Sequence, residues 1–525
     1  MNRALLNDDV LLQIMGFCGT MDRKTVCTLM QTCRLFHHAG ARHLLADGVS
    51  LHNEQIDSFV RFMFADGDYR LCLLRTLTIS ATTLPFYTGY SLAQLFRVLA
   101  TKGALRSLKL HYADSVLRSN YELPYAIAKL PTLKSLCMHN VGSHARRLLR
   151  HLRSELVYAN LRLPYQTFTE DEDEKVVESE DEDGDADTLI VEPHKSITEG
   201  DDDLIALLHR SRHSLRELLI TCAHDYSKAE AIVFPELISL TLYVTRLDCP
   251  VTGSLARTFP NLQEFDTHSF NPEQEPFDMD EFDICRDRNE DNQLEHGRWR
   301  ALRYYEGTPE VLYGLGISCR IDWVKLKAGD GEFEPYMLGE VLHDARPVHL
   351  DLAFWNTDWF RDEEFLEIFA EKGVRRLETL HIEVIADEGE EHLDMLRILN
   401  AVASRIVTPL RSLKEFRFTL DCDNFLPRGP NRDCAISTPL ELVLREVDLN
   451  GFAERLVQAS AAASGSLASV CIKLPSCSTS LKKWRRGECG PPTRDFHVAY
   501  GDELNTTHVW DEVDEKAWSG VQRFL

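Results

Sequence analysis

Long apolar runs, paired cysteine motifs and the signatures of common enzymes are all missing from this sequence. Because no stretch of about eighteen uncharged apolar residues occurs, the sequence predicts no membrane-spanning helix. Asp8 and Asp9 interrupt the apolar stretch that a secretion signal would need near the N-terminus. We therefore expect a protein of the cytoplasm, the nucleus or both, without a membrane partner.

Cysteines and catalytic motifs give a similar negative result. The 14 cysteines are scattered, with no C-x-x-C pair and no Cys/His cluster at the spacing of zinc ligands, which predicts reduced thiols and no metal site. The sequence also lacks a phosphate-binding glycine loop, a G-x-S-x-G turn and an H-E-x-x-H helix. We expect no catalytic residue, no cofactor and no enzyme activity.

Basic residues are too few to balance the carboxylates, and the formal net charge is -25. Most of the excess lies in two stretches: residues 170–187 hold 12 carboxylates and one Lys, and residues 271–295 hold 10 carboxylates and two Arg. The rest of the chain is only mildly acidic. Since nucleic acid is bound through basic surfaces that replace counterions, we expect no nucleic-acid ligand.

The first fifty residues show three short segments with helical spacing of apolar residues. The first carries Val10, Ile14 and Phe17, and two more follow before Gly48. Three helices of this length bury too little surface to be stable alone. The unit must therefore pack on the rest of the chain or on a partner.

After Leu51 the chain repeats a pattern in which an apolar residue is followed by two others, an apolar residue, one other and an apolar residue. The copies are Leu74, Leu77, Ile79; Leu105, Leu108, Leu110; Leu133, Leu136, Met138; Leu215, Leu218, Ile220; Leu237, Leu240, Leu242; Leu262, Phe265; Leu377, Leu380, Ile382; Leu413, Phe416, Phe418; and Leu467, Val470, Ile472. Weaker copies lie at 348–352 and 440–444. Each copy predicts a short strand, and segments such as 91–99 and 204–208 predict helices between the strands. Because each unit is covered only by its neighbours, the units must stack.

Two polar stretches and the last part of the chain depart from this pattern. Residues 169–187 predict a disordered acidic insert, which either only solvates the chain or binds basic partners. Residues 271–297 form a polar insert that carries a few apolar residues, so part of it can fold over the repeats. Trp299, Tyr304 and Tyr305 follow it and belong either to the core or to a binding surface. Residues 481–525 predict a terminal cap.

Two family resemblances follow from these segments. Residues 4–51 resemble an F-box, closest to the fungal form, through Leu6 to Leu11, Ile14, Phe17, Leu29 to Arg34, Phe36, Ala41 and Leu44, with Asn7 where the family usually has Pro. Residues 52–480 resemble irregular leucine-rich repeats. The expected fold is therefore α/β: a small N-terminal three-helix F-box (1–51), an irregular leucine-rich-repeat solenoid (52–480) and a C-terminal cap (481–525).

The two resemblances together imply a substrate-recognition subunit of an SCF-type ubiquitin ligase. The F-box would bind Skp1, and through it a cullin, while the repeats would hold a protein target. The resemblance assigns the Skp1 surface to Leu6, Val10, Leu11, Ile14, Phe17, Leu29 and Met30. Alternation along the strands assigns the target surface to Thr76, Thr78, Ser107, Lys109, Ser135, Ser239, Thr241, Thr379 and His381. The alternatives are a plain helical cap on a repeat array, and a leucine-rich-repeat scaffold that binds basic proteins through its acidic insert without any ligase.

Overall fold

A computed structural model describes residues 8–21, 23–163, 204–222, 232–244, 251–269, 279–328, 334–385, 394–421, 449–463, 465–473 and 482–485. The strands form one 15-stranded sheet in which sequence order equals spatial order. The strands β1 to β14 run parallel, and β15 pairs with β14 in the antiparallel direction. Within these ranges, none of the helices combines the length and the apolarity that crossing a membrane requires.

The strands are short, and most are followed by a helical connection. They are β1 (Val49–His52), β2 (Thr76–Ser80), β3 (Ser107–Leu110), β4 (Ser135–His139), β5 (Tyr158–Arg162), β6 (Glu217–Cys222), β7 (Ser239–Val244), β8 (Glu264–Ser269), β9 (Ala301–Gly307), β10 (Arg320–Lys327), β11 (His349–Trp355), β12 (Thr379–Ile385), β13 (Glu415–Asp421), β14 (Ser469–Lys473) and β15 (Lys482–Arg485).

The α-helices are α1 (Asp8–Met21), α2 (Arg23–Met30), α3 (Arg34–Ala46), α4 (Ile56–Phe64), α5 (Tyr69–Leu73), α6 (Phe86–Lys102), α7 (Ala113–Arg118), α8 (Leu123–Ala128), α9 (Ser143–His151), α10 (Leu204–Leu207), α11 (Thr252–Thr258), α12 (Met279–His296), α13 (Pro309–Gly314), α14 (Pro335–Ala345), α15 (Glu363–Ile368), α16 (Met395–Ala401) and α18 (Leu449–Ala462). Parallel strands need such crossovers, because a tight turn can only reverse the chain.

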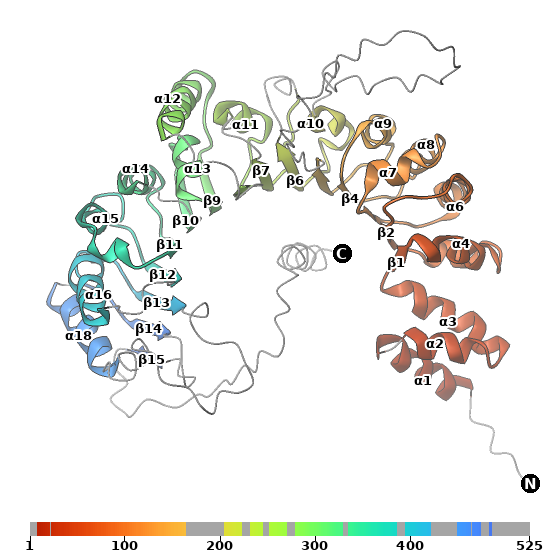
Figure 1. Cartoon of the computed structure of the whole chain (residues 1–525), viewed down its shortest axis with the longest axis horizontal. Coiled ribbons are helices and arrows are strands. Elements are labelled where there is room, and N and C mark those ends of the chain that lie inside the picture. Colours follow the sequence, from red (N-terminus) through yellow and green to blue (C-terminus); the bar gives the residue numbers. More distant parts are fainter. Residues whose placement is uncertain are drawn as a thin grey trace, which may run out of the picture.

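The sheet curves into an arc with its strands along the inner side and the helices along the outer side (Figure 1). Among the described residues, helices cover only the outer face of the sheet, and we call the inner face the open face (Figure 1). The recurrent apolar residues point to the helices: Leu77, Leu108 and Leu136 are neighbours in register and are completely buried. Burying a Leu in this way contributes roughly 1.5 to 3 kcal/mol.

The α/β class expected from the sequence is confirmed. The residues of the copies at 74–79 through 467–472 are buried, and the expected helices at 91–99 and 204–208 lie in α6 and α10. The strands β1, β5, β9, β10 and β15 are additions to those that the apolar copies predict. In β10, Ile321, Val324 and Leu326 follow the same spacing and are buried, so that copy is present in the sequence and was overlooked.

Several expected segments fall partly or wholly outside the described residues. The acidic insert 169–187 and the weaker copy at 440–444 lie outside them, as do residues 271–278 of the polar insert and 486–525 of the expected cap. The rest of the polar insert contains α12, which contacts α11 and α13. Residues 482–485 form the antiparallel strand β15.

A buried arginine joins the N-terminal helices to the helices that follow β1. The Arg70 guanidinium donates to the Phe62 carbonyl oxygen at 2.6 Å and to His37 Nε2 at 2.9 Å, pairs with Asp66, and stacks on the Phe62 ring. These contacts connect α3 with α4 and α5. Gly48, at φ +83°, then takes the chain from α3 into β1.

Candidate functional site

The helices α1 to α3 form a small core of their own. Met15, Val26, Met30, Phe36 and Ala41 are buried together, and Phe62 and Leu73 of the neighbouring helices pack against them. The close approach of α2 and α3 depends on Gly40, where a Cβ atom would lie 2.3 Å from Met30 Cγ. The three helices therefore pack as one unit against α4 and α5.

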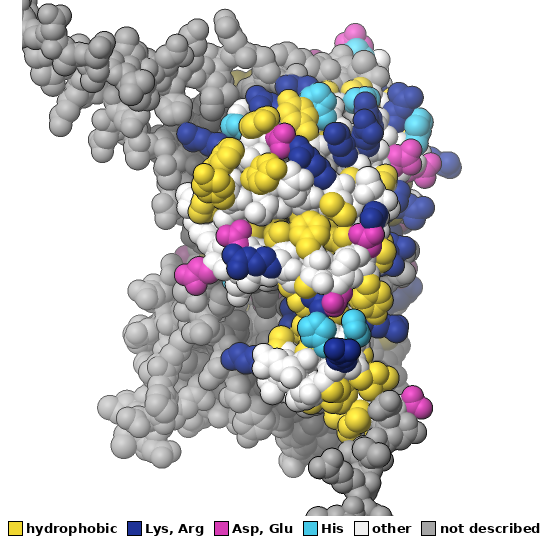
Figure 2. All heavy atoms as spheres, turned by 90° about the vertical axis from the view of Figure 1, so that its right-hand side faces the viewer, with side chains coloured by type: hydrophobic (Ala, Val, Ile, Leu, Met, Phe, Trp, Pro, Cys, Tyr) yellow, Lys and Arg dark blue, Asp and Glu magenta, His cyan; other side chains and the backbone are white. Residues whose placement is uncertain are grey.

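One apolar stripe of this unit is exposed to solvent. Val10, Ile14 and Phe17 follow one another at helical spacing along α1 and are 41%, 44% and 74% exposed. We call these three residues the α1 stripe. Apolar side chains are visible on this end of the molecule, at the bottom of Figure 2. Exposed apolar patches on folded units are typical of protein interfaces.

The other residues assigned to this surface lie differently. Leu11 and Leu29 are half-buried and pack against the three-helix core, and Met30 is inside it. Leu6 lies outside the described residues. Three of the seven residues therefore form an exposed surface, and Met30 lies in the core of the same unit.

The nine residues assigned to a target surface all lie on strands and are partly buried on the open face of the sheet. Register brings Thr76, Ser107 and Ser135 into one row across β2, β3 and β4, and places Thr78 beside Lys109. The remaining four form two separate groups, which are Ser239 and Thr241 on β7 and Thr379 and His381 on β12. They are parts of one long face and do not converge at a single point.

Charged and aromatic residues that the sequence analysis missed fill the face between these groups. The row in register with Thr241 continues through Asp266, Glu306, Lys325 and Asp351. Asp266 and Asp351 lie at alternate positions of strands that the sequence predicts. For Lys325 the signal is the apolar spacing in β10, whereas in β9 the pattern is incomplete because Gly307 takes its last position.

Glu306 is the centre of a compact ionic cluster. Its carboxylate accepts a hydrogen bond from Tyr304 Oη at 2.6 Å and pairs with Lys325 Nζ and Lys327 Nζ, each at 2.9 Å. Burial opposes ionisation, but the hydrogen bonds from Tyr304, Lys327 and Lys325 together lower the pKa of Glu306 to about 2. Glu306 is therefore ionised in any physiological medium.

Asp266 is the neighbour of Glu306 in register, and its pKa is shifted in the opposite direction. Burial and the negative charge of Glu306 raise the pKa of Asp266 to about 7, against a hydrogen bond donated by Thr241 Oγ1 at 3.3 Å. Its Oδ1 atom is buried without a hydrogen-bond partner among the described residues. Two adjacent carboxylates thus differ in protonation, which is typical of functional surfaces.

An exposed indole lies beside this cluster. Trp323 is 44% exposed, and its Nε1 donates to Asp351 Oδ2 at 3.0 Å. The rings of Tyr304 and His349 flank it at centroid distances of 5.6 and 5.8 Å. Of the expected aromatic cluster, Trp299 and Tyr305 are in the core, and Tyr304 is on the open face. A fixed, exposed Trp is a common anchor for a protein partner.

A histidine also belongs to this face. His381 lies between Asp351 and Thr419, and burial lowers its pKa, which favours the neutral ring. Over the part of the chain that the structure describes, no group of three or more His, Cys, Asp or Glu side chains is placed to hold a metal ion. The α1 stripe and the open face are the two candidate surfaces. No protein-family model matches the chain, and no curated protein matches it in sequence.

Proposed function

We propose that this protein is the substrate-recognition subunit of an SCF-type ubiquitin ligase. In this proposal the three-helix unit is an F-box that binds Skp1, and the arc of strands and helices is an irregular leucine-rich-repeat solenoid that holds a protein target. The protein itself does no chemistry. It raises the concentration of the bound target beside the ligase.

The observation that carries the proposal is the α1 stripe. The stripe stays exposed on a unit that has a packed core of its own. This unit lies at one end of the arc, whereas the Glu306 cluster lies on β9 and β10, farther along the arc (Figure 1). This separation allows an adaptor and a target to be bound at the same time. The proposal also uses the resemblance of residues 4–51 to an F-box.

The test is a binding measurement between the purified full chain and Skp1, with the variants Ile14→Asp and Phe17→Asp. A carboxylate in the buried centre of an interface typically costs about 2 kcal/mol or more, so we expect binding at least about 30-fold weaker. Both side chains are exposed in the free protein, so the melting temperature should not change.

The matched control is Arg42→Asp, an exposed position on α3. It should keep its affinity for Skp1. If the wild-type chain does not bind Skp1 at all, the ligase proposal is wrong. A leucine-rich-repeat scaffold that binds basic proteins through residues 169–187 then becomes the leading interpretation.

A further inference from the structure

Basic residues line the edge of the sheet at which the first strands begin. Arg75, Arg106 and Lys134 each precede the first open-face residue of β2, β3 and β4, and Arg216 takes this position before β6. Backbone hydrogen bonds of 2.7 Å join Arg106 N to the Arg75 carbonyl oxygen and Lys134 N to the Arg106 carbonyl oxygen. The three basic residues are therefore on directly adjacent strands, about 4.8 Å apart.

The connections that lead into these strands add more basic residues at the same edge. Lys129 follows α8, Arg153 follows α9, and Arg210 and Arg212 lie before β6; all four are exposed. We call these residues, together with Arg75, Arg106, Lys134 and Arg216, the cationic edge. Figure 2 shows Lys and Arg side chains gathered along one border of this side of the molecule.

Carboxylates are scarce in this part of the chain. Residues 85–155 contain eleven Lys and Arg but only three Asp and Glu. Asp114 accepts from the backbone of α9 and Glu122 pairs with Arg97, and both begin helices at the opposite edge of the sheet. Glu155 lies beside the cationic edge, where its carbonyl oxygen accepts from Lys134 Nζ. The net charge of -25 conceals this local positive surface.

Some cations near this edge have local structural roles. Lys102, at the end of α6, pairs with Asp68 and is for this reason not counted in the cationic edge. Arg75 and Arg210 donate to the carbonyl oxygens of Ala104 and Leu152, and cations are favoured at helix C-termini. These bonds orient the guanidinium groups, and no carboxylate among the described residues neutralises their charge.

The equivalent strand positions in the later part of the sheet are neutralised. Arg303 lies 3.8 Å from Glu264, and Lys414 lies 2.7 Å from Glu378, in each case a carboxylate near the start of the adjacent strand. Before β2, β3 and β4 the corresponding positions hold Arg75, Arg106 and Lys134, so that cation neighbours cation. The accumulation of charge is therefore specific to the first part of the sheet.

We infer that the cationic edge binds an acidic protein segment with a run of Asp and Glu residues. The inference rests on the proposed function in one respect, that this segment belongs to the ligase target. The cations are spread along the starts of β2 to β6 and do not converge at one point, so they suit a series of carboxylates better than a single phosphate. An extended segment advances about 3.3 Å per residue and can present a carboxylate to each strand. Nucleic acid fits less well, because none of the residues that form the edge is an aromatic on which bases could stack.

The experiment is a titration of the full chain against a short fluorescent oligoglutamate peptide, followed by anisotropy. We expect binding that weakens steeply as salt rises from about 50 to 200 mM. The triple variant Arg75→Glu, Arg106→Glu, Lys134→Glu should bind about tenfold more weakly or worse. Because Arg75 and Arg106 are exposed and Lys134 is half-exposed, the circular dichroism spectrum should be that of the wild type.

The matched control reverses three cations elsewhere on the chain: Arg303→Glu, Arg376→Glu, Lys414→Glu. It changes the net charge by the same amount and should bind the peptide like the wild type. An equal loss in both triple variants would overturn the inference, because the effect would then come from overall charge.

Three further results would also overturn it. The first is that a peptide with one phosphoserine binds more tightly than oligoglutamate, and the second is that oligothymidylate does so. The third is that oligoglutamate binds only after the carboxylates of residues 170–187 are replaced by amides. The third result would mean that the cationic edge binds residues 170–187 of the same chain and not a separate protein. No adaptor is present in this titration, so its failure leaves the Skp1 measurement, and the proposed function, untouched.

Discussion

At the scale of single residues, the protonation of Asp266 and Glu306 links the open face to stability. Asp266 has a pKa of about 7 in the folded protein, above its value in the unfolded chain. As pH rises from about 4 to about 7, the unfolded chain loses this proton first, so the contribution of Asp266 to stability falls. An amide in place of this carboxyl group has no proton to lose and would show no such decline.

We therefore predict that Asp266→Asn gains stability relative to the wild type as pH is raised from about 4 to about 8. Urea unfolding at several pH values measures this as a difference in midpoint. A gain of about 1 kcal/mol or more is expected at the high end, and a difference independent of pH would contradict the prediction.

Glu306→Gln is the comparison variant, and its stability relative to the wild type should change with pH in the opposite direction. The pKa of Glu306 is lowered to about 2, so its ionised form stabilises the fold above the unfolded pKa and that contribution is lost as pH falls toward about 2. The Gln variant should therefore be less stable than the wild type at neutral pH, and the difference should shrink in acid. The same urea series measures both variants.

Residue identity also explains what the sequence could and could not predict about the site. The α1 stripe follows from helical spacing and could be predicted, but the burial of Met30 depends on Gly40 letting α3 approach α2. The open-face positions of β2, β3 and β4 follow from alternation along expected strands. The apolar spacing in β10 could have placed Lys325 on the open face, but its pairing with Glu306 depends on the register between β9 and β10.

At the scale of elements, α12 buries polar side chains where a helix usually buries apolar ones. Phe282, Cys285, Arg286, Asn289 and Gln293 recur at helical spacing and are buried. Since only the first two are apolar, the sequence pattern indicated a polar insert, although the positions were those of a packed helix.

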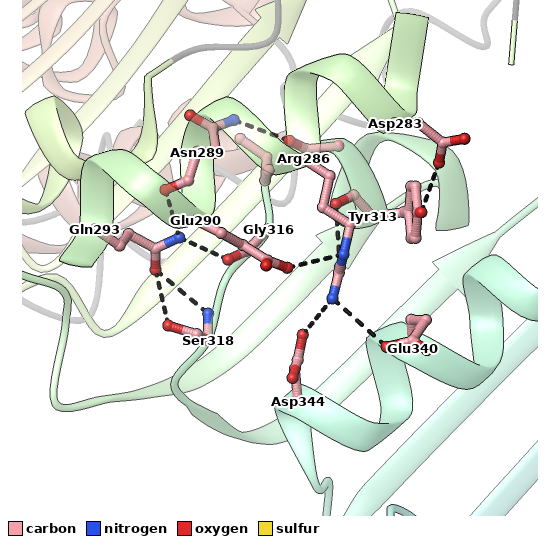
Figure 3. Close-up of polar contacts among 12 residues, drawn as sticks. Asp283, Arg286, Asn289, Glu290, Gln293, Tyr313, Gly316, Ser318, Glu340 and Asp344 are labelled. Carbon is pink, nitrogen blue, oxygen red and sulfur yellow. Dashed lines mark hydrogen bonds and ion pairs between the residues drawn. The ribbon is translucent and has the colours of Figure 1, made fainter. Parts of the chain in front are cut away.

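Hydrogen bonds take over the role of apolar contacts along α12 (Figure 3). Asn289 Nδ2 donates to the Gly314 carbonyl oxygen at 2.8 Å, and its Oδ1 accepts from Thr252 N at 2.9 Å. Gln293 Nε2 donates to the Gly316 carbonyl oxygen at 2.6 Å. The helix is thereby attached to α11 on one side and to α13 on the other.

Arg286 extends this attachment to α14. Its guanidinium lies 2.9 Å from Glu290 Oε1 and 2.7 Å from Asp344 Oδ2, and it stacks on the Tyr313 ring. We predict that Arg286→Met lowers the free energy of unfolding by about 3 kcal/mol, because Asp344 is left partly buried without its partner. Chemical denaturation followed by circular dichroism measures the loss.

The double variant Arg286→Met, Asp344→Leu is the control for this explanation. Replacing both members of the pair by apolar groups removes the unpaired charge, so part of the lost stability should return. If the double variant is less stable than the single one, unpaired charge is not the cause.

At the scale of the whole molecule, packing is local along the arc. Each strand pairs only with the strands before and after it, and the strongest helix contacts join helices that are adjacent or one apart in the sequence. Stability in such an array is close to a sum of units and the interfaces between them. A core defect should therefore weaken its own neighbourhood first.

Leu136→Ala tests this expectation. The side chain is completely buried in β4, and its removal should cost about 2 to 5 kcal/mol locally. Hydrogen exchange measured by mass spectrometry should show faster exchange in β3, β4 and β5 and unchanged exchange in β12 and β13. A uniform increase over the whole chain would instead indicate one cooperative unit.

More of the fold than of the binding surfaces could be predicted from the sequence. Period and spacing of apolar residues indicate the α/β class and most of the strands, because burial of one face repeats with every unit. The cationic edge could not be predicted, since it depends on which positions of successive units become neighbours, and the net charge of the chain points the other way.

The pairing of β5 with β6 has a practical consequence. Leu161 lies opposite Ile220 in register although the chain makes a long excursion between Arg162, the end of β5, and Glu217, the start of β6. Lengthening such an excursion costs little, because loop-closure entropy grows only with the logarithm of length. A fluorescent protein could therefore be grafted at this junction, leaving both chain ends untagged for imaging in living cells.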